Sequence, residues 1–201
     1  MTNEFKKNLT DAQRIIQDQQ QFEKLISDTA SKIAQTGLEQ LEGTIYAILR
    51  SLGQFFHAKL AFFGQFSKDG RKLNFTNIWS SEDLRPDSST FKIENTLETP
   101  IRKGPILNRE MNKMESEPAG LLDKDRLYRL LEDCGMKSSI VVPVCVQGRS
   151  IGLLGLDAFG RPLEYPLAIA DRLQIIADMI GSMMVRIQLQ VKSRINERTT
   201  K

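Results

Sequence analysis

The two cysteines of the chain, Cys134 and Cys145, are the residues best suited to nucleophilic or redox chemistry. Their spacing does not match the CxxC pattern of redox and zinc motifs. A redox-sensing thiol is one interpretation of either residue. The other is a structural cysteine that packs as a small apolar side chain, and we favour it because free cysteines in folded proteins are commonly buried.

The single histidine, His57, follows two phenylalanines at the predicted end of a helix. No cysteine or second histidine lies near it in sequence, which argues against a metal site, a haem site or a catalytic triad. A role at the surface or at the helix end is the simpler interpretation. The sequence therefore predicts no catalytic residue and no metal site.

Asp157 is the carboxylate that we single out for ligand binding, because it stands at the end of a predicted buried strand. Trp79, Tyr128 and Ser138 are candidates to line a pocket with it. Two structural interpretations stay open. Asp157 can cap the following loop by accepting hydrogen bonds from backbone N–H groups, and Trp79 can be an ordinary packing residue.

Two paired strands must position this carboxylate. Ser138–Val146 and Ser150–Ala158 are rich in β-branched and apolar residues, with a glycine-containing turn between them. Pro143 cannot donate a ladder hydrogen bond, which predicts a bulge or a sheet edge at that position. Gly152 and Gly155 predict places where another element approaches the second strand closely.

The N-terminal half predicts two helices followed by two strands. Residues 4–36 contain no glycine or proline and predict one long helix, with a coiled-coil-like apolar spacing that Gln19 and Glu23 interrupt. The apolar stripe within 38–56 predicts a helix that faces a sheet. Lys59–Phe66 and Lys72–Ser80 are predicted strands, joined by an Asp-Gly turn.

Four prolines interrupt the polar segment 81–118, so we expect no long element there. Short edge strands are predicted at Thr90–Ile93 and Gly104–Leu107. Leu122–Cys134 is apolar at helical spacing and predicts a short amphipathic helix. Loop regions of this length in a compact domain are usually functional.

The last predicted helix begins near Leu167 and continues to the end of the chain. Its apolar residues recur in steps of three and four, as in a heptad seam: Leu173, Ile176, Ile180, Met183 and Ile187. Beyond Met184 we expect nothing within the chain to pack against this stripe, although Val191 and Ile195 continue it. A partner helix explains the pattern, and we predict a parallel homodimer through the terminal helices.

Charge and composition bound the class of protein. The chain has 28 basic and 25 acidic residues and a net charge of +3, so it has no electrostatic footprint for nucleic acid. Its N-terminal segment is polar and lacks the apolar core of a signal peptide. No apolar run approaches the roughly 18 residues that span a bilayer. We therefore expect a cytoplasmic protein without a membrane span.

Several of these features, taken in order, resemble a GAF domain from Phe22 to Arg186. The residues that carry the resemblance include Gly135-Met136-Lys137-Ser138, Val142-Pro143-Val144, Gln147-Gly148-Arg149 and the run from Ile151 to Asp157. The resemblance implies an α+β fold of the GAF/PAS-like type. In that fold a central antiparallel β-sheet has the N- and C-terminal helices packed on one face, and loops and a short helix cover a pocket on the other.

The resemblance also implies a domain organisation. We expect a linker or dimerisation helix at 1–36, a GAF-like sensory domain at 37–185 and a C-terminal signalling-helix extension at 186–201. The implied role is regulatory rather than enzymatic. A small ligand would bind, and the terminal helices would transmit the signal to an output domain of the histidine kinase or diguanylate cyclase type, in the same protein or on a separate chain.

Two alternatives to this role stay open. The first is a dimerisation and transmission module that binds no ligand. The second is a thiol redox sensor or enzyme that uses Cys134 and Cys145. Free methionine sulfoxide reductases also resemble GAF domains, but they use more cysteines than this chain provides.

The sequence lacks the motifs by which members of the family bind bilins or cyclic nucleotides. Bilin-binding relatives commonly have a histidine after the attachment cysteine, whereas Gly135 follows Cys134. Cyclic-nucleotide-binding relatives share an N-K…F…D-E signature, of which only Asn112-Lys113 occurs. The identity of the ligand is therefore left open.

Overall fold

The computed structural model describes residues 2–67, 72–82, 95–96, 106–108, 136–161, 163 and 166–199. The described elements, in chain order, are α1 (Thr2–Gln35), the 3-10 turn η1 (Leu38–Gln40), α2 (Leu41–Phe55), β1 (Leu60–Phe66), β2 (Lys72–Ser80), β3 (Asn95–Thr96), β4 (Ile106–Asn108), β5 (Met136–Val146), β6 (Arg149–Phe159) and α4 (Pro166–Thr199). These strands form one antiparallel sheet in the order β3-β2-β1-β6-β5-β4.

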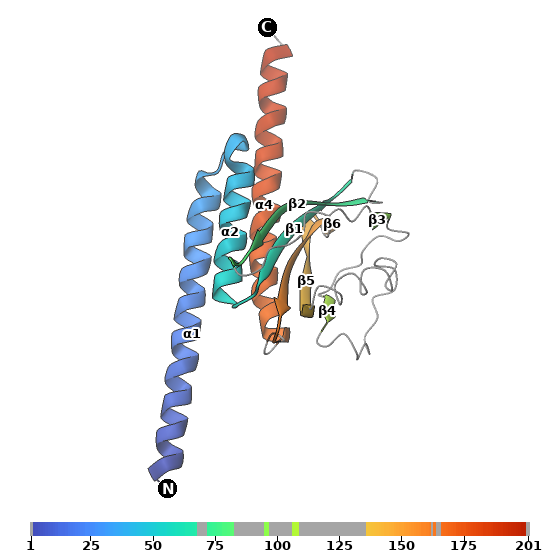
Figure 1. The fold of residues 1–201 in the computed structure, drawn as a ribbon. Helices are drawn as coiled ribbons and strands as arrows, with labels where there is room; N and C mark the ends of the chain where they lie inside the picture. Colours follow the sequence, from blue (N-terminus) through green and yellow to red (C-terminus); the bar gives the residue numbers. More distant parts are fainter. Residues whose placement is uncertain are drawn as a thin grey trace.

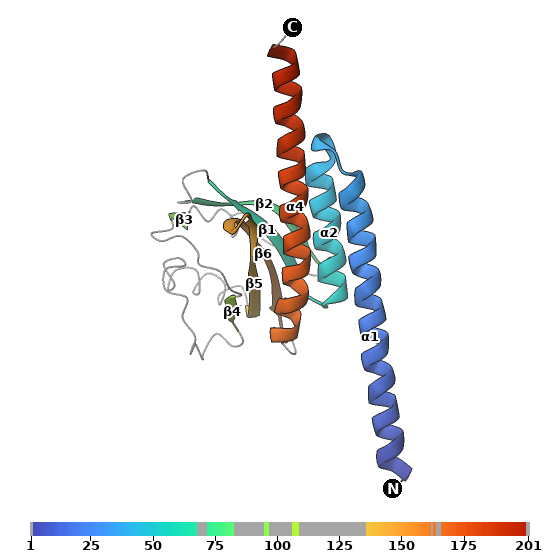
Figure 2. The same ribbon diagram turned by 180° about the vertical axis from the view of Figure 1, so that it is seen from behind.

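Helices cover one face of this sheet, which confirms the predicted α+β architecture. Figures 1 and 2 show α2 and α4 against the sheet and α1 outside them. The apolar stripe of α2 is buried at Ile45, Ile48, Leu49 and Leu52. It meets inward-facing residues of the strands such as Phe63, Val142 and Leu154, which belong to the same core cluster. The hydrophobic core therefore lies between the helices and the sheet.

The β5–β6 hairpin follows its predicted turn chemistry. Gln147 and Gly148 form the turn with φ angles of 49° and 78°, the conformation that the right-handed twist of a two-residue hairpin requires. On the outer side of β5, the described residues of β4 pair with Ser139, Ile140 and Val141. A register shift follows at Val144/Cys145. Of the two alternatives predicted for Pro143, the bulge agrees with this irregularity, which begins at the next residue.

Some predicted elements of the middle region differ or cannot be compared. The short strand β3 lies at Asn95–Thr96, whereas the predicted Thr90–Ile93 lies outside the described residues. β4 overlaps the predicted strand Gly104–Leu107. The predicted helix Leu122–Cys134 also lies outside the described residues.

One prediction about α4 is wrong. All five residues of its heptad seam are buried by the chain itself, including Ile187, which is 3% exposed. The reason is that the end of α1 lies beside this part of α4. Arg186 Nη2 donates hydrogen bonds to the carbonyl oxygens of Ile33 and Thr36, at 2.6 and 2.9 Å. The chain therefore supplies its own packing beyond Met184, as far as Ile187.

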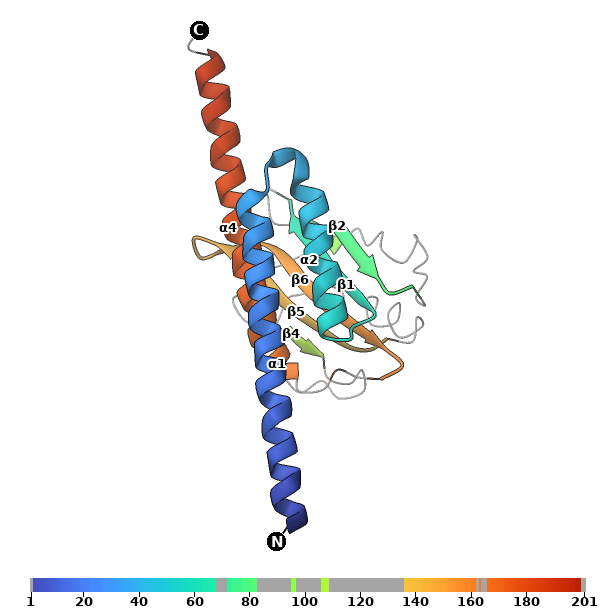
Figure 3. The same ribbon diagram turned by 90° about the vertical axis from the view of Figure 1, so that its left-hand side faces the viewer.

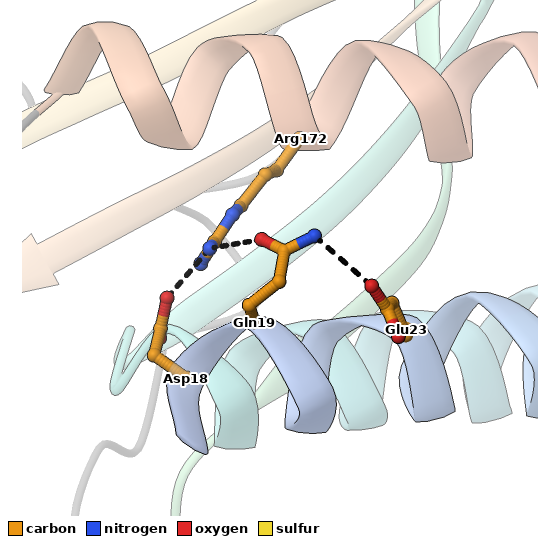
Figure 4. A network of polar contacts seen from close by, with 4 residues as sticks. All are labelled: Asp18, Gln19, Glu23 and Arg172. Atoms are coloured by element: carbon orange, nitrogen blue, oxygen red, sulfur yellow. Dashed lines mark hydrogen bonds and ion pairs between the residues drawn. The ribbon is translucent and has the colours of Figure 1, made fainter. Parts of the chain in front are cut away.

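A second polar contact holds α1 against α4 four turns earlier (Figure 4). Arg172 Nη2 lies 2.5 Å from Asp18 Oδ2 and 3.4 Å from Gln19 Oε1, and Gln19 in turn bonds Glu23. The guanidinium of Arg172 also lies 4.7 Å from the ring centroid of Phe22, which is buried. The side chains that interrupt the coiled-coil spacing of α1 thus form the network that fixes its register on α4.

Candidate functional site

A row of residues crosses the sheet where β1 begins. Cross-strand pairing joins Ser80 of β2, Leu60 of β1, Asp157 of β6 and Ser139 of β5. We call this set the Asp157 row. Paired residues of antiparallel strands lie on the same face of the sheet. Ala61 and Trp79, one position away, belong to the core on the helix side. The Asp157 row therefore lies on the face opposite the helices.

Asp157 is the buried charge-bearing group of this row. The residue is 5% exposed, and burial raises the pKa of its carboxyl group from 3.8 to about 7, while a hydrogen bond with the Ser139 side chain lowers it in part. Its Oδ1 has no hydrogen-bond partner among the described residues. Its backbone carbonyl is satisfied by the N–H of Lys59 at 3.0 Å. Loop capping, the structural alternative for Asp157, is not seen within the described part.

A second row of residues, next to the first and on the same face, is apolar. It consists of Ile78, Phe62, Gly155 and Val141, paired across β2, β1, β6 and β5. We call this set the Phe62 row. A Cβ atom at Gly155 would lie 2.1 Å from Phe62 Cζ, so the absent side chain makes room for that ring. Phe62 also meets Phe75 edge to face, with centroids 5.3 Å apart.

The structure does not bring Trp79 together with Asp157. Trp79 is 8% exposed and packs on the helix side, where its ring fills the space left by Gly53 of α2. Strand alternation explains this placement, because Trp79 is adjacent to Ser80 and must point to the other face. Trp79 therefore packs in the core and does not line a pocket together with Asp157.

Ser138 also lies apart from the Asp157 row. It is 2% exposed, and its Oγ accepts a hydrogen bond from the backbone N–H of Leu163 at 2.9 Å. This bond ties the chain after β6 back onto β5. Sequence reasoning chose Ser138 and missed Ser139, the next residue, whose side chain does bond Asp157. Only the register between β5 and β6 distinguishes the two serines.

The other singled-out residues are placed as follows. Tyr128 and Cys134 lie outside the described residues. Cys145 is half-buried in β5, and its role as a redox group stays a prediction. His57 is exposed with a φ of 53° just after α2. Among the described residues, no group of three His, Cys, Asp or Glu side chains could hold a metal ion.

None of the helices in the described segments combines the length and the apolar character that crossing a membrane requires.

The fold and the site together define an α+β domain with helices on one face of the sheet and a buried carboxylate on the other. The sequence model of the GAF domain family matches residues 40–183. The chain therefore belongs to the GAF domain family, whose members are regulatory sensory domains. The resemblance seen in the sequence is confirmed.

Solved structures agree with this assignment of the fold. The phycoerythrobilin-bound GAF domain of a cyanobacterial phytochrome is 16% identical, with a TM-score of 0.63 over 84% of this chain and 97% of that one. A GAF domain from Pseudomonas syringae pv. tomato, described as part of a sensor histidine kinase, is 15% identical, with a TM-score of 0.60 over 90% and 98%. At such identities the likeness shows the fold alone. No curated protein sequence matches the chain.

Proposed function

We propose that this GAF domain is a sensor that binds a small ligand on the sheet face opposite the helices and transmits the signal through α1 and α4. One observation carries the proposal: the buried Oδ1 of Asp157 has no hydrogen-bond partner among the described residues. More than nine in ten buried polar groups of native proteins are hydrogen-bonded. A bound molecule supplies the missing partner.

The strands that hold the Asp157 row also contact α4, which gives the signal a path. On β5 and β6, Ile140 and Leu156 flank the row on the helix side and pack in the same core as α4. Gln174 Nε2 of α4 donates a hydrogen bond to the carbonyl oxygen of Pro143 in β5, at 3.0 Å. A ligand with different affinities for two arrangements of the sheet would thereby shift the position of α4.

The output belongs to the same proposal. We propose an output domain of the histidine kinase or diguanylate cyclase type, in the same protein or on a separate chain. The family assignment and the relative described as a sensor histidine kinase support this choice. In the proposed division, residues 1–36 and 186–201 are the connecting helices and residues 37–185 are the sensor.

Native mass spectrometry tests the ligand. We expect the folded protein, after incubation with a small-molecule extract of its host cells, to carry a defined excess mass that unfolding releases. Asp157→Asn should reduce this excess mass at least about tenfold in occupancy at limiting ligand, since a hydrogen bond to a charged group contributes roughly 1.5–3 kcal/mol. A folded wild-type protein that never carries excess mass would instead support the ligand-free transmission module.

We also propose that a second copy of the chain packs along the terminal helices. Leu189 and Ile195 of α4 are 61% and 57% exposed, and Ile15 and Ile16 of α1 are 70% and 57% exposed. Figure 3 shows that α1 extends past the sheet at its N-terminal end and α4 at its C-terminal end. Since the heptad seam of α4 is buried within the chain, the dimer contact must use these exposed residues.

Sedimentation velocity at tens of micromolar tests the dimer. We expect the wild-type chain to sediment as a dimer, and Leu189→Glu with Ile195→Glu to raise its dissociation constant at least about tenfold, because each charge would be buried without a partner. Tyr46→Glu is the matched control, since Tyr46 is 47% exposed on α2, away from these helix ends. If the wild-type chain sediments as a monomer under these conditions, the proposed dimer is wrong, whereas the assignment of the fold is unaffected.

A further inference from the structure

The two rows define the chemistry of the ligand as well as its place. Resting on the proposed function above, we propose that the site takes a planar nitrogen cation, such as an amidinium or a protonated aminoheterocycle. Its N–H groups would donate to Asp157 Oδ1, and its flat face would lie on the Phe62 row.

The carboxylate requires a donor, and a positively charged one. Ionised, Asp157 is an acceptor only, and one oxygen already interacts with Ser139. The paired neighbours of Asp157 are Leu60 and Ser139, and its neighbours on the same face of β6 are Gly155 and Phe159. None of these four residues titrates or carries a cation. A ligand with a cationic N–H donor would supply the missing hydrogen bond and balance the buried negative charge of Asp157. An anion would instead add a second unpaired negative charge.

The Phe62 row favours a flat ligand. Phe62 is 8% exposed, and its ring lies over Gly155, where a Cβ atom would come within 2.1 Å of Phe62 Cζ. Phe75 fixes the ring of Phe62 by an edge-to-face contact. An aromatic face next to a carboxylate attracts a planar cation twice, through stacking and through the cation–π interaction. A flexible aliphatic amine could satisfy the carboxylate but would use little of this surface.

A pair of isosteric probes separates charge from shape. Benzamidinium and benzamide have the same size and flat shape, but only benzamidinium carries two N–H groups in a cationic fork. We expect benzamidinium to shift the amide resonances of β1, β5 and β6 in NMR titrations, with an affinity at least about tenfold above that of benzamide. Asp157→Asn should abolish this preference, because the asparagine side chain is neutral.

The pH dependence of binding gives a second readout. Since the proton and the probe compete for the same carboxylate, the affinity for benzamidinium should rise about tenfold for each pH unit up to the pKa of Asp157 and then level off. That pKa is about 7. Ser139→Ala removes the hydrogen bond that favours the ionised carboxylate, so it should shift this profile to higher pH while the preference for benzamidinium persists.

Each outcome decides between the proposals. Equal binding of both probes, unchanged by Asp157→Asn, would overturn the proposal that the ligand is a cation. It would still support a ligand site on this face of the sheet. No binding of either probe to folded protein at millimolar concentration would overturn the inference and indicate that a buried water satisfies Asp157 Oδ1. If native mass spectrometry identified the excess mass as an anion or a lipid, the proposed sensor function would be supported and the proposed cationic ligand would be wrong.

Discussion

Asp157→Asn should make the folded protein much more stable at alkaline pH and change little at acidic pH. Burial raises the pKa of Asp157 from 3.8 to about 7, so the folded state holds a proton that the unfolded state releases between these values. The stabilising contribution of this proton is complete below 3.8 and is lost as the pH rises through about 7. The free energy of unfolding should fall by about 1.4 kcal/mol per pH unit in this window, on the order of 4 kcal/mol in all.

Urea unfolding at several pH values measures this effect. The wild-type free energy of unfolding should decline between about pH 4 and pH 7, and Asp157→Asn should remove that decline. Asp171→Asn is a suitable control, because Asp171 is an exposed residue of α4. A wild-type decline that persists unchanged in Asp157→Asn would show that the carboxylate is solvated or paired in the folded state, and it would also weaken the case for a ligand at Oδ1.

Much of the fold could be predicted from the sequence because its signals are local. The apolar stripe of α2, the β-branched run of β5 and the Gln147–Gly148 turn are each specified by neighbouring residues. The family resemblance then supplied the order and layering of these pieces. The limits of α2 and β2 agree with the predictions to within a few residues.

The candidate site was harder to predict, since it depends on pairing between distant strands. Asp157 was recognised from its position at the end of a buried strand. Ser139 was not, because a shift of one residue in the β5–β6 register exchanges Ser138 and Ser139 between the two faces. For Trp79 the sequence left both pocket lining and core packing open, and strand alternation in β2 places it in the core.

The packing face of α1 depends on tertiary contacts in a similar way. Of the apolar residues of α1, Ile16 is 57% exposed, whereas Phe22 is buried. Phe22 is held by the ring of Phe55, at 5.7 Å between centroids, and by Arg172. Neither partner is near Phe22 in sequence, so no periodicity within α1 could reveal the contact.

Gly53→Ala should destabilise the protein although it lies inside a helix, where alanine is normally favoured by about 1 kcal/mol. A Cβ atom at Gly53 would lie 1.9 Å from Cζ3 and 2.4 Å from Cε3 of Trp79. The indole ring is 8% exposed and packed in the core, so it can yield only by displacing other core side chains. Such overpacking costs about 1–3 kcal/mol. After the helix-propensity gain of about 1 kcal/mol is subtracted, we expect a net loss of up to about 2 kcal/mol in urea unfolding.

Gly43→Ala on the same helix is the matched control, because a Cβ atom there meets no other atom within 4 Å. It should stabilise the protein by up to about 1 kcal/mol through helix propensity alone. The difference between the two variants therefore isolates the contact between α2 and Trp79. Because Trp79 is the one tryptophan of the sequence, its fluorescence should change in Gly53→Ala and not in Gly43→Ala. Equal stabilisation by both alanines would show that the indole lies elsewhere, and it would return Trp79 to the candidates for the ligand site.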